Sequence, residues 1–126
     1  MAIQITPLAN DKLKAFFLEK KLEFTKNSGC VLAKDNNGNL LGYCAYFLDE
    51  QSITIVALDE YPDLFLADGI LRSALHVADF RGISTAFYQD TAPVSVFHKL
   101  DFIKNEQDKT LKIEKLHQSC CGCSNF

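Results

Sequence analysis

Long hydrophobic runs are absent from this sequence of 126 residues, in which uninterrupted apolar stretches extend over only a few positions. A helix that crosses a bilayer needs about 20 consecutive apolar residues, so we expect no membrane-spanning segment and no membrane partner. The first residues also lack the basic segment followed by an apolar one that is typical of a secretory signal peptide. These absences predict a cytoplasmic protein.

An excess of basic residues is absent as well. The chain has 13 Lys and Arg against 16 Asp and Glu, and its formal net charge is -3. Proteins that bind nucleic acid usually carry a basic surplus that neutralises phosphates, so we expect no nucleic-acid partner. The acidic surplus gathers between Asp49 and Asp68. We expect this loop region to attract a positively charged substrate, such as a small-molecule or peptide amine.

Internal repeats and linkers are also absent. Hydrophobic residues make up 48% of the chain and charged residues 23%, which is typical of a globular protein. A chain of this length has room for one domain. We therefore expect a single domain over residues 1–116, followed by a cysteine-rich tail over residues 117–126.

The five cysteines fall into two groups. Cys30 and Cys44 each stand alone among apolar residues and are predicted to be small core residues. Cys120, Cys121 and Cys123 crowd the last seven positions. Structural zinc sites usually pair two ligand sets separated by a loop, which this tail lacks, so we assign no metal ligand. A packed tail, a metal site and a reactive thiol all remain open.

The alternation of apolar and polar residues predicts a mixed α+β chain. An Asp-Asn-Asn-Gly turn at residues 35–38 predicts a β-hairpin, and Gly82 is a suitable helix end. Such an order gives a central mixed sheet with helices on its faces. The expected strands cover residues 2–6, 30–33, 40–48, 52–58, 84–88 and a final hairpin over 102–113, and the expected helices cover residues 10–22, 62–80 and 92–101.

The segment after the fifth expected strand carries a family resemblance. It reads Phe97-His98-Lys99-Leu100-Asp101-Phe102, preceded by Asp90. This segment and the order of elements resemble the Gcn5-related N-acetyltransferase (GNAT) superfamily, which has a Tyr-x-Lys-Leu-Gly-Phe pattern after an Asn-containing turn. The resemblance implies the acyl-CoA N-acyltransferase fold, with helices on both faces of the sheet. Asp90 takes the place of the family's Asn, and Phe97 that of its Tyr.

The resemblance also implies acetyl-CoA as cosubstrate. In the family, an Arg/Gln-x-x-Gly-x-Gly/Ala loop brings backbone N–H groups at a helix start to the pyrophosphate. The matching segment here is Leu64–Gly69, in which only Gly69 fits, and Asp63 and Asp68 would repel a pyrophosphate. An ordinary helix start with Pro62 as its first residue is the other interpretation. The resemblance places the cofactor-binding residues at Ala57, Leu58, Phe65, Leu66, Ala67, Asp68, Gly69, Ile70 and Asp90.

For catalysis, the resemblance implies a carboxylate base at the end of the fourth strand. Glu60 is the first candidate and Asp59 the second, while Phe97 cannot serve as the proton donor that the family's tyrosine provides. The implied reaction is direct attack of a primary amine on acetyl-CoA by a monomer or homodimer. The alternatives are a non-catalytic binding or regulatory module of the same fold, and a metal- or thiol-handling protein that acts through the tail.

Overall fold

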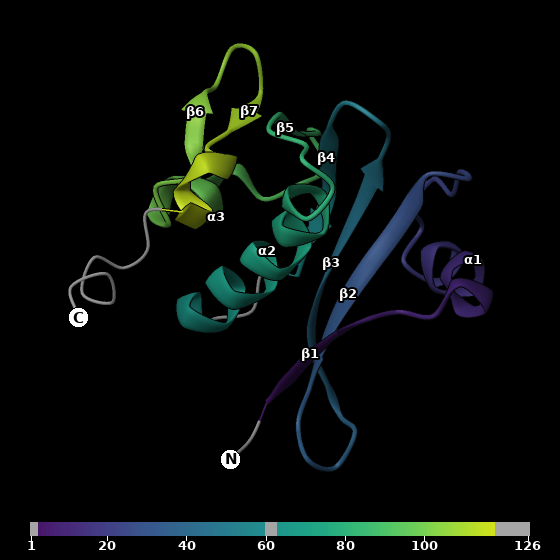
Figure 1. The fold of residues 1–126 in the computed structure, drawn as a ribbon. Coiled ribbons are helices and arrows are strands. Elements are labelled where there is room, and N and C mark those ends of the chain that lie inside the picture. The colour runs from purple at the N-terminus through teal and green to yellow at the C-terminus, as the bar shows by residue number, and fades with distance from the viewer. Residues whose placement is uncertain (1–2, 60–62, 118–126) are drawn as a thin grey trace.

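The computed structural model describes residues 3–59 and 63–117. The expected order of strands and helices is confirmed, with one additional short helix at the end (Figure 1). The elements are β1 (Gln4–Pro7), α1 (Asn10–Glu19), β2 (Ser28–Lys34), β3 (Leu40–Leu48), β4 (Ile53–Leu58), α2 (Leu64–Asp79), β5 (Ala86–Tyr88), α3 (Val94–Lys99), β6 (Ile103–Asn105), β7 (Thr110–Leu111) and the 3-10 helix η1 (Ile113–His117).

One seven-stranded sheet organises the described residues, in the order β1-β2-β3-β4-β5-β7-β6. All neighbouring strands are antiparallel except β4 and β5, which are parallel. A parallel pair needs a long crossover connection, and α2 supplies it. The predicted mixed sheet is therefore confirmed.

Helices cover both faces of this sheet, as expected (Figure 1). Successive strand residues point to opposite faces, so each strand contributes to two cores. On one face, Leu13 and Phe17 of α1 pack with strand residues that include Leu32 and Val56. On the other face, α2 packs with the larger cluster through residues that include Ile70. Within the described part of the chain, no helix is both long and apolar enough to cross a membrane.

Most expected boundaries differ from the observed ones by one or two residues, and the end of the first helix differs by three. The first helix ends at Glu19 rather than at residue 22, because Lys21 adopts a left-handed conformation with φ of 61° that cannot continue a helix. The last strand ends at Leu111, and Ile113 begins η1 instead of extending the strand. Ile113 is nonetheless buried, with 3% of its surface exposed. The alternation of apolar residues therefore marked the burial correctly but not the backbone conformation.

Candidate functional site

The parallel strands β4 and β5 pair over only a short distance. Their register joins Ile53 to Ala86 and Ile55 to Tyr88. β5 ends there, whereas β4 continues to Leu58. Ala57 and Leu58 therefore have no described strand beside them on the β5 side, and the carboxyl-terminal ends of the two strands open toward the start of α2.

A β-bulge lies at this opening. Tyr46 of β3 faces Ile55 and Ala45 faces Ala57, so Val56 is an extra residue on β4. A bulge bends its strand and changes the direction of neighbouring groups. The Val56 carbonyl accepts a 2.6 Å hydrogen bond from the hydroxyl of Thr91 in the loop before α3. One side chain thus connects the bulged strand to the loop after β5.

The start of α2 is closed by a side chain of its own. The Asp63 carboxylate accepts hydrogen bonds from the backbone N–H groups of Phe65, at 2.9 Å, and Leu66, at 3.2 Å. Such an N-cap satisfies amide groups that have no partner inside the helix. The first-turn amides expected to bind pyrophosphate are therefore already bound to an internal anion.

The other acidic residue of this segment, Asp68, is balanced within the helix. Its carboxylate lies 2.9 Å from Nε of Arg72 in a partly buried ion pair. The guanidinium of Arg72 also lies over the ring of Phe102, 5.3 Å from its centre. Asp68 therefore contributes less repulsion than its sequence position suggested, and Asp63 is the anion that occupies the helix start.

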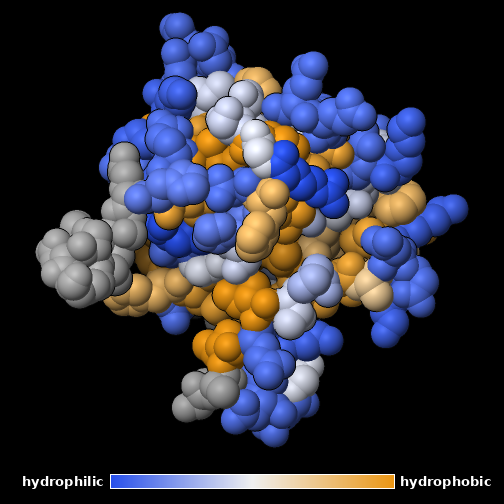
Figure 2. Space-filling model, in the orientation of Figure 1, coloured by the Kyte–Doolittle hydropathy of each residue, from blue (hydrophilic) through white to orange (hydrophobic). Residues whose placement is uncertain are grey.

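The remaining residues expected at the cofactor site have mixed surroundings. Gly69 is half-buried, and a Cβ there would lie 3.3 Å from Cδ1 of Ile5. Phe65 is 91% exposed, and hydrophobic side chains lie among hydrophilic ones on the face that α2 crosses (Figure 2). Four of the expected cofactor-binding residues are buried in the hydrophobic core instead: Leu58, Leu66, Ala67 and Ile70.

Of the two expected bases, only Asp59 lies within the described residues. It is half-buried at the end of β4, and its N–H donates a 2.9 Å hydrogen bond to the carbonyl of Tyr43. Burial raises the pKa of the Tyr43 phenol, and the negative charge of Asp59 adds to this effect. Glu60 lies outside the described residues, as do Cys120, Cys121 and Cys123.

The acidic stretch from Asp49 to Asp68 does not form one loop region, and that expectation was wrong. β4 separates Asp49 from Asp59. At about 3.3 Å per residue, its six residues place the two acids at opposite ends of the strand, about 20 Å apart. Only the part from Asp59 onward lies near the β4–β5 opening.

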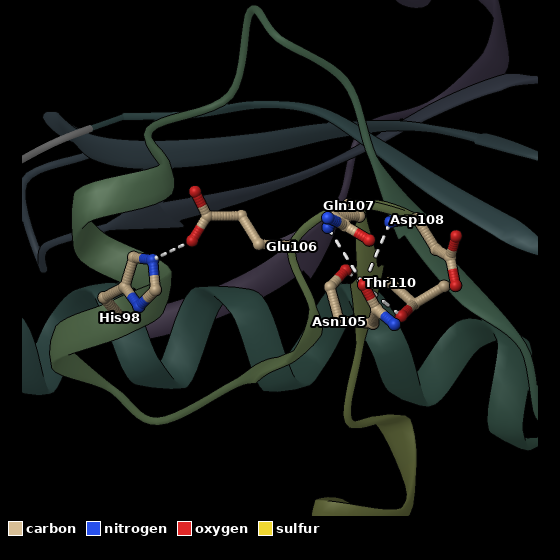
Figure 3. Close-up of polar contacts among 6 residues, drawn as sticks. All are labelled: His98, Asn105, Glu106, Gln107, Asp108 and Thr110. Carbon is tan, nitrogen blue, oxygen red and sulfur yellow. Dashed lines mark hydrogen bonds and ion pairs between the residues drawn. The ribbon is translucent and has the colours of Figure 1, made fainter.

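A second wall of the opening comes from α3 and the turn between β6 and β7 (Figure 3). Nε2 of His98 lies 2.8 Å from the Glu106 carboxylate, which ties α3 to this turn. Asp90 lies in the loop after β5 and forms a 2.7 Å ion pair with Lys109. Glu106, Asp90 and Lys109 border a small cavity of about 170 Å³, which Tyr88 also lines.

Phe97 lies behind this wall without any exposed surface. Its ring packs against Tyr88, with the ring centres 5.3 Å apart. Burial raises the pKa of the Tyr88 phenol. The position that the resemblance assigns to a tyrosine acid is therefore a core position in this chain.

Sequence reasoning missed Val56 and Thr91. A run of strand-forming residues does not indicate where a bulge will occur, because a bulge depends on the register of the neighbouring strand. Thr91 directly follows Asp90, which the resemblance assigned to the cofactor site, so Thr91 could have been identified from this position.

Comparison of the sequence with protein-family models and with curated proteins gives no match. Comparison of the structure gives many. The ribosomal-protein-S18-alanine N-acetyltransferase from Escherichia coli is 13% identical, with a TM-score of 0.58 over 82% of this chain and 79% of that chain. An acetyltransferase of the GNAT family from Staphylococcus aureus Mu50 is 13% identical, with a TM-score of 0.52 over 80% of both chains.

A chain of the KacTA–DNA complex is 16% identical, with a TM-score of 0.60 over 93% of this chain and 97% of that chain. Matches at such low identity establish a common fold. The mixed sheet, its strand order and its helices on both faces agree with these structures. The resemblance expected from the sequence is thus confirmed for the architecture, and the chain has the fold of the Gcn5-related N-acetyltransferases.

Proposed function

We propose that this chain binds acetyl-CoA in the opening between β4 and β5 and transfers its acetyl group to a primary amine. One observation carries the proposal: the parallel pairing stops at Ile55 and Tyr88, whereas β4 continues past a bulge at Val56. The free side of Ala57 and Leu58 offers backbone groups to an extended, amide-containing chain such as the pantetheine arm. The acetyltransferase fold supports this assignment.

In the proposed reaction, the amine nitrogen forms a bond to the thioester carbonyl carbon, and the bond between that carbon and sulfur breaks. The electron pair of this bond leaves on sulfur. The carboxylate of Glu60 or Asp59 takes the amine proton, directly or through water. Phe97 has no proton to donate, so the thiolate takes its proton from solvent. Asp59 and Glu60 would also attract a cationic amine toward the end of β4.

A second candidate is a non-catalytic module of the same fold. Asp63 favours it, because its carboxylate occupies two amides at the start of α2. A pyrophosphate at this place would meet a negative charge and would have to displace it. The third alternative, chemistry through the cysteines of the tail, predicts metal content or thiol reactivity that is lost when Cys120, Cys121 and Cys123 are replaced by Ser.

Calorimetric titration with acetyl-CoA and with CoA tests the proposal. The wild type is expected to bind both in the micromolar range. Asp63→Asn keeps the cap but removes its charge, so it is expected to tighten binding about fivefold, which corresponds to about 1 kcal/mol. Asp11→Asn removes one exposed charge from the first turn of α1, away from this opening, and is the matched control, with unchanged affinity expected. Absence of binding to both Asp63→Asn and the wild type would refute the proposal.

Transfer is measured separately, with labelled acetyl-CoA and a panel of polyamines and lysine-containing peptides. Glu60→Gln and Asp59→Asn are the variants that test the base. The proposal requires at least one of them to lower the rate of transfer while acetyl-CoA binding stays unchanged. Binding of acetyl-CoA without transfer to any amine would favour the non-catalytic module.

We also infer that nucleic acid is not a partner, because the net charge is -3 and the cations are dispersed. A structurally similar chain comes from a complex with DNA, so a mobility-shift assay with duplex DNA is the direct test. A salt-sensitive complex would contradict the inference.

A further inference from the structure

A second cavity lies at the opposite end of α2 from the opening between β4 and β5. Its volume is about 460 Å³, within the range typical of small-molecule sites. Val77 and Arg81 line it from the end of α2, whereas Asp63 caps the start of that helix. At 1.5 Å per residue, the 16 residues of α2 separate the two places by about 24 Å.

The cavity exists because β1 covers only part of β2. β1 pairs with β2 from Val31 to Lys34, and a last hydrogen bond joins the N–H of Leu8 to the carbonyl of Cys30. β2 begins earlier, at Ser28. Within the described part of the chain, no strand lies beside Ser28 and Gly29 on that edge. The cavity lies there, lined by Leu13 of α1 and Val77 of α2.

Tyr46 reaches into this cavity across Gly29. The two residues face each other in the β2–β3 pairing, and a Cβ at Gly29 would lie only 2.5 to 2.7 Å from the end of the Tyr46 ring. Only glycine leaves room for the ring to point toward the uncovered edge. Tyr46 is 6% exposed, and no described residue forms a hydrogen bond with its hydroxyl. No buried side-chain N or O atom of the described residues lacks a partner, so this hydroxyl is not itself fully buried. It reaches the cavity, where a ligand or water can bind it.

Two cations on the rim of the cavity are also free. Neither Lys26 nor Arg81 forms an ion pair or a side-chain hydrogen bond with a residue that the structure describes. Burial raises the pKa of Tyr46 to about 12, and the nearby charge of Arg81 acts against this shift. Asp49 and Glu50 line an adjoining cavity with Arg81, but the Asp49 carboxylate already accepts hydrogen bonds from the N–H groups of Gln51 and Ser52.

Three donors without a partner among the described residues therefore surround a cavity whose walls are partly apolar and partly polar, the polar part including Asn10, Asn27 and Ser28. The buried side chains of Leu13 and Cys30 line it from one side of the sheet, and Val77 lines it from the other. The donors suit a negatively charged acceptor, and the apolar walls suit an organic body rather than a bare inorganic anion.

We propose that this cavity binds a small organic carboxylate. Its carboxylate contacts Arg81, Lys26 and the Tyr46 hydroxyl, and its apolar body lies against Leu13 and Val77. The proposed site does not involve acetyl-CoA, so this proposal can be tested separately from the acetyltransferase function.

The test is a titration of the full chain with 3-phenylpropionate, followed by the amide resonances of the protein. Saturable shifts confined to residues around Ser28, Gly29, Leu48 and Val77 are expected, with a Kd on the order of 1 mM for so small a probe. The neutral amide of the same acid is expected to bind at least about fivefold more weakly, because it lacks the charge that the cations attract. Equal binding of acid and amide would overturn the proposal, as would the absence of saturable shifts.

Variants locate the site. Arg81→Gln and Lys26→Gln are each expected to weaken binding about fivefold or more, and Tyr46→Phe about threefold. Both cations are exposed, so their replacement leaves the core intact, and the thermal midpoint verifies folding. Lys34→Gln, at the far end of β2, is the matched control and is expected to bind like the wild type. Unchanged affinity in both Arg81→Gln and Lys26→Gln would refute the assignment.

Discussion

The hydroxyl of Thr91 donates a 2.6 Å hydrogen bond to the carbonyl of Val56, a residue 35 positions earlier in the chain. Val56 is the extra residue of the β4 bulge, and Thr91 lies in the loop that follows β5. The bond therefore crosses the end of the β4–β5 pair at the place where strand pairing stops. It holds the loop before α3 against the bulge.

Replacing this hydroxyl by a methyl group is expected to destabilise the fold. Thr91→Val keeps the shape of the side chain but leaves the Val56 carbonyl without its partner, at a cost of about 1 kcal/mol. Thr91→Ser keeps the hydroxyl and is the matched control. The measurement is the free energy of unfolding from urea titration. Equal stability of the Val and Ser variants would show that the hydrogen bond contributes nothing.

Gly29 and Gly69 are expected to respond differently to a methyl group. In Gly29→Ala the new Cβ would lie 2.5 Å from the Tyr46 ring, so the ring must move, at a cost of about 1 to 3 kcal/mol. In Gly69→Ala the nearest atom is a flexible methyl at 3.3 Å, and alanine favours the helix by about 1 kcal/mol. Unfolding midpoints compare the two variants. A Gly29→Ala protein as stable as Gly69→Ala would contradict the position of the Tyr46 ring.

The cap of α2 can be separated from its charge. Asp63→Ala removes the acceptor for the N–H groups of Phe65 and Leu66 and is expected to cost about 1 kcal/mol of unfolding free energy. Asp63→Asn retains a capping oxygen and is expected to lie close to the wild type. Thermal unfolding at neutral pH distinguishes them. If Ala and Asn were equally destabilising, the charge rather than the cap would be the stabilising feature.

Asp49 predicts an acid-dependent part of the stability. Hydrogen bonds from the N–H groups of Gln51 and Ser52 hold the pKa of this carboxyl below its ordinary value of 3.8. A carboxyl with a lowered pKa in the folded state stabilises the fold above its unfolded pKa, and this contribution is lost as pH falls through the folded value. The difference in thermal midpoint between wild type and Asp49→Asn is thus expected to shrink below about pH 4. A difference that stays constant from pH 7 to pH 2.5 would refute this.

Much of the fold could be predicted because it depends on local patterns. Strand β3 has the bounds that its sequence predicted, from Leu40 to Leu48. A glycine-containing turn precedes it, and the aromatic residues within it favour a strand. The apolar spacing of α2 likewise predicted the buried residues from Ile70 to Ala78, but Phe65, which the same spacing assigned to the core face, is 91% exposed. The end of α1 could not be read in this way, because Lys21 adopts a backbone conformation that lysine rarely prefers.

The candidate site was predictable in its place along the chain but not in its chemistry. The sequence alone determined that acidic residues stand at the start of α2 and that phenylalanine stands where a tyrosine was expected. Only the tertiary structure decided that Asp63 binds the amides of the first turn and that Asp68 is paired with Arg72. The bulge at Val56 and the cavity beside Gly29 also depend on it. Local periodicity determines which residues are buried, whereas strand register and the length of a neighbouring strand determine which groups are left without partners.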